Sequence, residues 1–232
     1  MVKKLLLSYC ALVHLYAPSY AASSDSLKLI TQVREHAHYS CAECHAIDGN
    51  PPITDQYNKQ SPTLAGQDMD YLIRQLLAFK AGERQTDEMK GIMQDYSRSE
   101  IKKIAQYFSK QPLKIASNLN PTIDTLIHTQ KEDAIWVEKG KKLYQEGDIK
   151  RNIASCQSCH GIKGEGNKIK HAPQLTAQHA RYVRMALHEY QQGKRTTDKA
   201  FGSPMQLITK KLSNDDIKEL AAYIQSMTPS SP

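Results

Sequence analysis

Two distant stretches of the chain carry apolar residues at the spacing of one face of an α-helix. The members of the two faces are Ile101, Ile104, Ala105 and Phe108, and Ile217, Leu220, Ala221 and Ile224. A serine precedes each stretch, and an acidic residue follows that serine three positions later, as in Ser97 with Glu100 and Ser213 with Asp216. The first pair has the pattern of a capping box, whose reciprocal hydrogen bonds start a helix, and the second pair is a near relative of that pattern. The sequence therefore predicts two helices that begin in the same way.

Four further helices are predicted from apolar spacing and from their ends. Helical intervals cover about 68–81 and 179–192, and a glycine follows each stretch at the usual C-terminal stop. Helical spacing also precedes each of two cysteine pairs, over about 27–39 and 132–145. No stretch alternates apolar and polar residues convincingly, so the predicted fold class is all-α.

The order of landmarks in the first half of the chain recurs in the second half. At one constant offset, Pro62, Leu64, Gln67, Tyr71, Gly82 and Arg84 correspond to Pro173, Leu175, Gln178, Tyr182, Gly193 and Arg195. The helix-opening serines and a short cysteine motif recur in the same order. We therefore predict two homologous domains, 23–115 and 130–232, joined by a linker over 116–129.

Composition narrows the functional class further. The chain has 232 residues, 40% of them hydrophobic and 24% charged, and a formal net charge of +7. This length fits two small domains, and this composition excludes a disordered or an acidic solvating chain. No apolar run reaches the roughly 18 residues that a membrane span requires. No transmembrane segment is therefore expected after removal of the N-terminal segment.

That N-terminal segment has the layout of a secretory signal peptide. Two lysines form a short positive region, residues 5–15 are mostly apolar, and small residues follow. We predict that residues 1–22 are removed, with cleavage after Ala21 or Ala22, and that the mature protein lies in the periplasm. The apolar run is short for a span, which argues against an uncleaved anchor.

Each half of the chain contains one Cys-x-x-Cys-His motif. Two thiols one helical turn apart can add to the two vinyl groups of a haem, and the adjacent histidine is then held under the iron as an axial ligand. Two such motifs in aligned repeats, behind an export signal, predict two covalently bound haem c groups. The residues concerned are Cys41, Cys44 and His45, and Cys156, Cys159 and His160.

Other interpretations of the cysteine pairs need features that the sequence lacks. A structural zinc site requires a second pair about 15–20 residues away, whereas these two pairs are 115 residues apart. A thioredoxin-like redox motif requires a βαβ context, which the helical pattern does not provide. A plain disulfide within each pair stays open as a third interpretation.

The ligand on the other side of each iron decides between electron transfer and small-molecule chemistry. A methionine sulfur opposite histidine is typical of electron-transfer cytochromes, whereas an open position binds ligands or reacts with peroxide. We expect the methionine in the loop before the last helix of each repeat. Met205 lies eight residues before Ser213, and Met89 lies eight residues before Ser97. Met89 and Met205 are thus the predicted ligands, with Met93 as the alternative in the first repeat.

Two further pairs of repeated residues suggest supporting roles. The carbonyl groups of Pro62 and Pro173 are candidates to accept the Nδ1–H of the two motif histidines and so orient the imidazoles. Arg84 and Arg195 follow the middle helices, where a solvated cation is favoured by the helix dipole. The alternative for both arginines is an ion pair with a haem propionate.

The ordered set of motifs in both halves resembles the dihaem cytochromes c4. The set comprises Cys-x-x-Cys-His, Pro-x-Leu-x-x-Gln followed by Tyr, Gly-x-Arg, and a methionine eight residues before Ser-x-x-Asp/Glu-Ile. The resemblance implies two tandem class I cytochrome c domains, each wrapped around a covalent haem with histidine and methionine ligands. It also implies a pseudo-twofold arrangement that brings the haems close together. The first repeat departs from the family at Ala46 and Arg34, where the second has Gly161 and Gly140.

The resemblance implies a periplasmic carrier of single electrons in a respiratory chain, not an enzyme. Its partners would be redox proteins, namely a quinol-oxidising donor and a terminal oxidase as acceptor. Residues 22–121 carry 12 basic and 12 acidic side chains, whereas residues 122–232 carry 17 and 12. This imbalance has two interpretations, a solvated face or a surface of the second domain on which an acidic redox partner docks. No nucleic-acid recognition motif is present, and peripheral membrane association stays open.

Two alternative functions stay open from the sequence. The same domains serve as electron-transfer subunits of periplasmic dehydrogenase complexes. A protein that lacks one sixth ligand would instead bind small molecules at the haem or act as a peroxidase.

Overall fold

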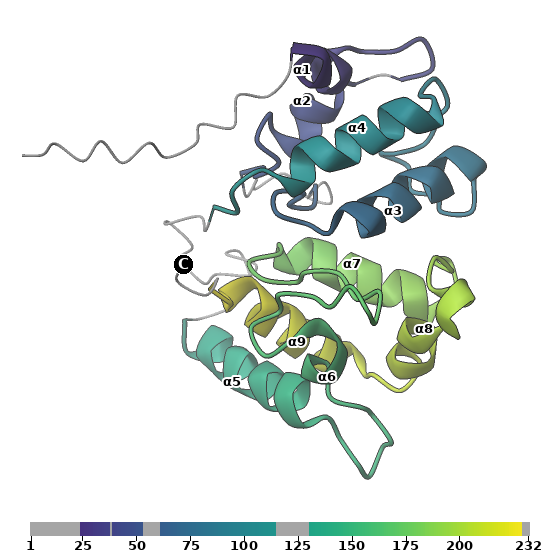
Figure 1. Ribbon diagram of the computed structural model, residues 1–232. Coiled ribbons are helices and arrows are strands. Elements are labelled where there is room, and N and C mark those ends of the chain that lie inside the picture. Colours follow the sequence, from purple (N-terminus) through teal and green to yellow (C-terminus); the bar gives the residue numbers. More distant parts are fainter. Residues whose placement is uncertain (1–23, 38, 53–60, 115–129, 229–232) are drawn as a thin grey trace, which may run out of the picture.

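The helices form two groups that follow one another along the chain and lie one above the other in Figure 1. The structure is a computed structural model. It describes residues 24–37, 39–52, 61–114 and 130–228. The helices are α1 (Ser24–Thr31), α2 (Cys41–His45), α3 (Met69–Ala81), α4 (Arg98–Ser109), α5 (Gln130–Glu146), α6 (Gln157–His160), α7 (Ala180–Gln191), the 3₁₀ turn η1 (Lys199–Phe201), α8 (Pro204–Thr209) and α9 (Asn214–Ser226). The predicted signal peptide and linker lie outside the described residues, so they and the domain boundaries stay predictions.

Over the described residues the chain is helical and contains no strand. Its only β-type pairings there are two isolated bridges, Asp148 with Ile153 and Asn167 with Ala172. Within the same part of the chain, no helix is long and apolar enough to cross a membrane. The all-α prediction is confirmed.

Each group of helices encloses its own hydrophobic core. In the first repeat, α1, α3 and α4 bury a cluster that includes Ile30, Ile101 and Phe108. In the second repeat, α5, α7 and α9 bury a separate cluster that includes Tyr144 and Ile217. Because each core closes within one repeat, each repeat presents its own helical scaffold to a cofactor.

The two last helices begin as their capping boxes predict. The Ser97 hydroxyl accepts the backbone N–H of Glu100 at 3.2 Å, and the Glu100 carboxylate accepts the N–H of Ser97 at 2.8 Å. In the second repeat the corresponding distances for Ser213 and Asp216 are 3.1 and 2.6 Å. At the start of each helix, α4 and α9, two backbone N–H groups that would lack a partner within the helix thus donate to side-chain oxygens.

The prediction of a helix over 27–39 is wrong in its second half, because α1 ends at Thr31. The partner helix α5 packs tightly on α9 at Gly140, where an added Cβ would lie 1.9 Å from the Glu219 carbonyl oxygen. The first repeat has no glycine at this place and instead has Arg34. The guanidinium of Arg34 reaches Glu100 at 2.8 Å, outside any helix. A close helix crossing therefore forms in only one of the two repeats.

The two repeats meet along α3 and α7, which face one another across the middle of Figure 1, and along the segments that lead into these two helices. The Gln178 amide accepts the N–H of Thr63 at 2.9 Å and donates to the Thr63 carbonyl at 3.0 Å. The Gln67 amide accepts the N–H of Gln174 at 2.9 Å and donates to the Gln174 carbonyl at 2.9 Å. Gln67 corresponds to Gln178, and Thr63 to Gln174, at the constant offset of the repeat. The interface is therefore reciprocal, as a pseudo-twofold arrangement requires.

Candidate haem sites

The two Cys-x-x-Cys-His motifs form the short helices α2 and α6. Cys41 packs against the first core and Cys156 against the second. Burial raises the pKa of Cys41 to about 11 and that of Cys156 to about 12, so neither is a thiolate at neutral pH. The four motif cysteines form no disulfide bonds. Among the described residues, no group of three or more His, Cys, Asp or Glu side chains could hold a metal ion. The geometry thus gives no support to a zinc site or to a disulfide within each pair.

The motif histidines are buried and held by the predicted proline carbonyls. His45 Nδ1 lies 3.0 Å from the Pro62 oxygen, and His160 Nδ1 lies 2.9 Å from the Pro173 oxygen. Burial lowers the pKa of both histidines, although the carbonyl partner acts in the opposite direction. A neutral imidazole that donates from Nδ1 keeps the lone pair on Nε2 for an iron. The prediction for the prolines is confirmed in both repeats.

Met89 and Met205 occupy comparable environments. Met89 lies in the turn before α4, is partly buried and packs against the first core. Met205 is also partly buried and packs against the second core. Met93, by contrast, is 2% exposed and belongs to the core itself. Met205 lies on the short helix α8 and not in an irregular loop as expected, because Pro204 occupies the first helical position, where proline is favoured.

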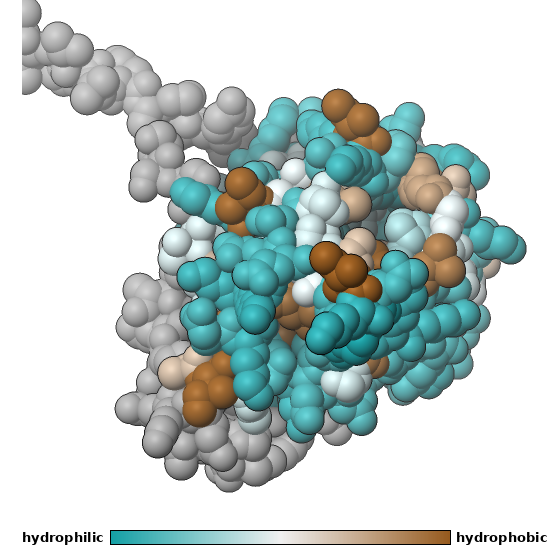
Figure 2. All heavy atoms as spheres, turned by 90° about the horizontal axis from the view of Figure 1, so that it is seen from below, coloured by the Kyte–Doolittle hydropathy of each residue, from teal (hydrophilic) through white to brown (hydrophobic). Residues whose placement is uncertain are grey.

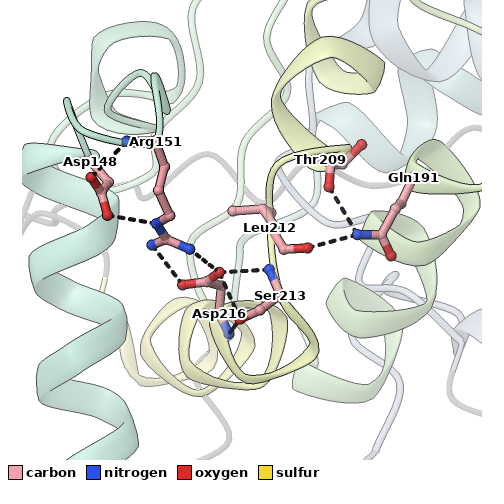
Figure 3. A network of polar contacts seen from close by, with 7 residues as sticks. All are labelled: Asp148, Arg151, Gln191, Thr209, Leu212, Ser213 and Asp216. Atoms are coloured by element: carbon pink, nitrogen blue, oxygen red, sulfur yellow. Dashed lines mark hydrogen bonds and ion pairs between the residues drawn. The ribbon is translucent and has the colours of Figure 1, made fainter.

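A network of polar contacts fixes the connection between α8 and α9 (Figure 3). The Gln191 amide donates to the carbonyl oxygens of Thr209 at 3.0 Å and Leu212 at 2.8 Å. The Thr209 hydroxyl donates to the Met205 carbonyl at 2.8 Å. The backbone that carries Met205 is thereby tied to α7.

On the other side of the same connection, an arginine joins two acidic residues. Arg151 donates to Asp148 at 2.6 Å and to both oxygens of Asp216 at 2.6 and 3.0 Å (Figure 3). Asp216 also completes the capping box at the start of α9. The start of α9 is therefore tied to the turn that follows α5.

Arg195 is 2% exposed and lies in the interface between the repeats. It donates to the Tyr71 hydroxyl at 2.6 Å and to the Gln75 side-chain oxygen at 2.9 Å, both on α3. It also lies 3.4 Å from the Tyr182 hydroxyl. One of the two predicted roles of Arg195 is that of a solvated cation at the end of the middle helix. This prediction is wrong, because the side chain is buried.

Arg84, the corresponding residue of the first repeat, is also buried, with 5% of its surface exposed. Its guanidinium donates to the same Gln75 oxygen at 2.8 Å and lies 3.4 Å from the Tyr182 hydroxyl. The solvated role is therefore wrong for Arg84 as well. Each arginine is buried because side chains of the other repeat cover it. The sequence of one repeat alone does not reveal this contact.

The two buried guanidiniums retain unused hydrogen-bonding capacity. Neither Arg84 Nε nor Arg195 Nε has a hydrogen-bond partner, although both atoms are buried. One carboxylate, that of Glu189, lies 3.8 Å from Arg84. Burial alone would raise the pKa of Tyr182, but the two guanidiniums lower it to about 8. Unused N–H groups and surplus positive charge at a buried position fit the carboxylates of haem propionates.

Two residues of this interface do not recur between the two repeats, so the sequence comparison of the repeats does not point to them. Gln75 and Glu189 correspond to Ala186 and Ala78 at the constant offset, so a search for recurring landmarks passes over them. The one local sign of a role is that each lies on a middle helix, α3 or α7, at a position where the other repeat has alanine.

The helical fold and the paired motifs define the chain as a c-type cytochrome with two haem-attachment sites. The family model for cytochrome c matches residues 137–228. Cytochrome c4 of Stutzerimonas stutzeri is 32% identical over 198 residues, which cover 81% of this chain and 84% of that protein. The crystal structure of reduced recombinant cytochrome c4 from Pseudomonas stutzeri matches with a TM-score of 0.68 and 31% identity, over 81% of this chain and 93% of the other. The chain belongs to the cytochrome c4 family.

The name of a further relative refers to a dehydrogenase and not to the cytochrome c4 family. A protein of Stutzerimonas stutzeri strain A1501 called thiosulfate dehydrogenase electron acceptor is 27% identical over 208 residues, which cover 89% of this chain and 88% of that protein. The chain is thus similar both to proteins named cytochrome c4 and to a protein whose name gives its electron donor.

Family membership confirms the predicted fold class and cofactor. The chain carries two covalently bound haem c groups and is an electron carrier. When bound, each haem iron takes up and releases one electron. The chain's own residues bury this group, hold its axial ligands and place charge beside it.

Proposed function

We propose that His45 with Met89, and His160 with Met205, are the axial ligands of the two irons. The thioether bonds would form at Cys41, Cys44, Cys156 and Cys159. The observation that carries this proposal is the Nδ1 contact to a proline carbonyl, which is present in both repeats at 3.0 and 2.9 Å. It fixes the orientation of each ring and leaves Nε2 as the coordinating atom.

The choice of Met89 over Met93 rests on position and burial together. Met89 lies as many residues before its capping serine as Met205 does, and both are partly buried. The side chain of Met93 fills the first core, where it packs with Ile92 and Tyr96. A core methionine of this kind contributes to packing. If Met93 were the iron ligand instead, its side chain would have to leave the first core.

The physiological role that we infer is the transfer of single electrons in the periplasm, from the quinol-oxidising side of respiration towards a terminal oxidase. Two haems in one chain allow an electron to enter at one repeat and leave at the other. Export would follow from the predicted signal peptide at 1–22. The chemistry needs no bound substrate, so the surface of the protein, and not a pocket, selects its partners.

The basic second repeat is the proposed docking surface for an acidic redox partner. Exposed lysines lie along α5 and on both sides of α6, among them Lys141, Lys142, Lys163, Lys168 and Lys170. Figure 2 shows the underside of the molecule as mostly hydrophilic, with separate hydrophobic spots and no broad apolar area. Such a surface favours a transient complex in which charge orients the encounter.

A second candidate role is that of an electron-accepting subunit for a periplasmic dehydrogenase. The similarity to the thiosulfate dehydrogenase electron acceptor, which extends over 89% of this chain, favours it. The two roles differ in the donor and not in the haem sites. Purification of the native protein alone or together with a dehydrogenase distinguishes them.

The test of the ligand set is a redox-resolved optical spectrum of protein matured in the periplasm, with carbon monoxide added to the reduced form. We expect two low-spin haems per chain, a ferric sulfur-to-iron charge-transfer band and no response to carbon monoxide. A high-spin fraction that binds carbon monoxide would contradict the proposal. It would favour the ligand-binding or peroxidase alternative instead.

A further inference from the structure

A buried aspartate contacts the backbone of Met205, the proposed ligand of the second iron. Asp198 is 8% exposed, and its carboxylate accepts the N–H of Met205 at 2.8 Å. The other carboxylate oxygen, Oδ1, is buried and has no hydrogen-bond partner. Burial of a carboxylate costs free energy, and a charge-assisted hydrogen bond offsets part of that cost. The bond to Met205 is thus of the strong kind, in a place where packing alone would favour an apolar side chain.

Asp198 also organises the turn that leads into α8. Its backbone carbonyl accepts the N–H groups of Phe201 at 2.9 Å and of Ser203 at 3.1 Å. Ser203 precedes α8 with a φ of 55°, in the left-handed region that favours glycine, and its side chain makes no capping hydrogen bond. The Asp198 carboxylate accepts the N–H of the second residue of α8 instead, as a capping side chain does. A strained turn of this kind persists because its surroundings hold it.

Hydrogen bonds fix the backbone on both sides of the Met205 side chain. The Met205 N–H donates to Asp198, and the Met205 carbonyl accepts the Thr209 hydroxyl at 2.8 Å. The Thr209 carbonyl in turn accepts the amide of Gln191 on α7. Because a side chain leaves the backbone in one of a few rotamers, a fixed backbone limits the positions that the Met205 sulfur can reach.

The first repeat holds its methionine in a different way. The Met89 N–H donates to the neutral hydroxyl of Thr86 at 3.2 Å. In both repeats an aspartate lies three residues after the buried arginine, but Asp87 is exposed. Met89 lies two residues after Asp87, whereas Met205 lies seven residues after Asp198. The five additional residues let the chain turn back, so that the carboxylate faces the methionine backbone in the second repeat.

We propose that Asp198 is a positioning residue that keeps Met205 in place as an axial ligand of the second iron. This inference rests on the proposed ligand pair of His160 and Met205. A thioether that leaves the iron opens a coordination position to other ligands. The hydrogen bond from the Met205 N–H to Asp198 opposes this loss, because the backbone has to break it before the side chain can move away. A ligand that is held in advance also needs little rearrangement when the iron gains or loses an electron.

The test is a titration of the ferric dihaem protein with imidazole, followed at the sulfur-to-iron charge-transfer band. Asp198→Ala removes the acceptor of the Met205 N–H. We expect imidazole to displace the sulfur of the second haem at about a tenfold lower concentration in this variant, the effect of losing one hydrogen bond to a charged group. Asp198→Asn keeps an oxygen that accepts the same N–H, so its titration should lie closer to that of the parent protein.

Two further variants show whether Asp198 acts through Met205. In Met205→Ala the remaining band belongs to the first haem, and its titration identifies that haem in every other variant. Adding Asp198→Ala to Met205→Ala should leave this remaining curve unchanged, because the ligand on which Asp198 acts is already absent. Asp87→Ala is the matched control, since it removes an exposed carboxylate from the corresponding place in the first repeat. Its titration should match that of the parent protein.

An unchanged titration in Asp198→Ala, or equal effects of Asp198→Ala and Asp87→Ala, would overturn the inference. Haem content per chain and the midpoint of thermal unfolding confirm that each variant folds. A lower unfolding midpoint with an unchanged titration would show that Asp198 stabilises the fold alone, and would also overturn it. A failure of the proposed ligand set appears separately, because Met205→Ala would then stay low-spin and would not bind carbon monoxide when reduced.

Discussion

At the scale of single residues, a short contact to the backbone sets the chemistry of each motif histidine. The Pro62 and Pro173 carbonyls could be predicted because they lie close in sequence to the histidines that they orient. Arg84 and Arg195 could not be placed from the sequence, because their burial depends on the other repeat. A residue whose partners are local is predictable from pattern, whereas a residue covered by a distant segment is not.

The methionine ligands give a direct prediction at this scale. Met89→Ala should convert one haem to a high-spin form that binds carbon monoxide and has a lower midpoint potential, because the thioether ligand that stabilises ferrous iron is gone. The measurement is the reduced spectrum with and without carbon monoxide, together with a redox titration.

Met93→Leu is the control for this variant. It conserves the volume of a side chain in the first core and should cost less than about 1.5 kcal/mol of stability. Both haems should remain low-spin. Carbon monoxide binding in Met93→Leu and not in Met89→Ala would exchange the roles of the two methionines.

At the scale of elements, the helix ends that depend on nearby residues lie where the sequence predicts them. The capping boxes place the starts of α4 and α9 correctly, and Gly82 ends α3 in the left-handed conformation that favours glycine. The end of α1 could not be predicted from spacing, since it depends on whether the helix can approach α4 closely. A glycine at the crossing permits that approach in the second repeat only.

The crossing of α5 and α9 leads to the second prediction. In an ordinary helix interior, Gly→Ala stabilises by about 1 kcal/mol. At Gly140 the added Cβ would meet the Glu219 carbonyl at 1.9 Å, so the helices must separate. We expect Gly140→Ala to destabilise the second repeat by about 1–3 kcal/mol, as overpacking does. Denaturant unfolding measures this, with the exposed Lys141→Ala as the control. A more stable Gly140→Ala variant would contradict the close crossing.

The start of α9 leads to the third prediction, which concerns pH. Burial raises the pKa of Asp216, but Arg151 and the Ser213 contacts outweigh burial and lower it below its ordinary value of 3.8. A carboxyl group with a lowered folded pKa stabilises the fold above its unfolded pKa, and this stability is lost as the pH falls through the folded value. Asp216→Asn should therefore be less stable at neutral pH by about 1–2 kcal/mol, because its hydrogen bonds with Arg151 and with the Ser213 N–H lose the assistance of the carboxylate charge.

The difference between Asp216→Asn and the parent protein should begin to shrink below about pH 4, where the carboxyl of the unfolded chain takes up a proton. It should continue to shrink as the pH falls towards the lowered pKa of the folded protein. Asp215→Asn, a change in the same turn of an 81% exposed side chain, should show little of either effect. Thermal unfolding of the three proteins from pH 3 to pH 7 measures the difference. A constant gap over this range would rule out the ionised carboxylate as the stabilising group.

At the scale of the whole molecule, the uneven distribution of charge leads to the fourth prediction. Lys141→Glu with Lys142→Glu reverses two exposed charges on α5 of the basic repeat. We expect slower electron exchange with an acidic redox protein and a weaker dependence of the rate on ionic strength, because electrostatic attraction steers the encounter. Stopped-flow rates over a range of salt concentrations measure both quantities.

The control for this variant is the same reversal in the neutral repeat, Lys102→Glu with Lys103→Glu, which should change the rates much less. Faster exchange in the Lys141 and Lys142 variant, or equal effects of the two pairs, would show that the basic repeat is not the docking surface. Unchanged midpoint potentials in both variants would establish that the rates report docking.

The reciprocal glutamine bridges have a consequence for how such a molecule can arise and assemble. Gln67 holds the backbone of the second repeat as Gln178 holds that of the first, so one surface patch binds its own equivalent. This is the contact of an isologous homodimer. In a pair of separate subunits, its occupancy would fall on dilution, whereas two copies fused in one chain meet at a high effective concentration. Fusion also frees the two copies to diverge, and a carboxylate can then occupy one side of the axis alone.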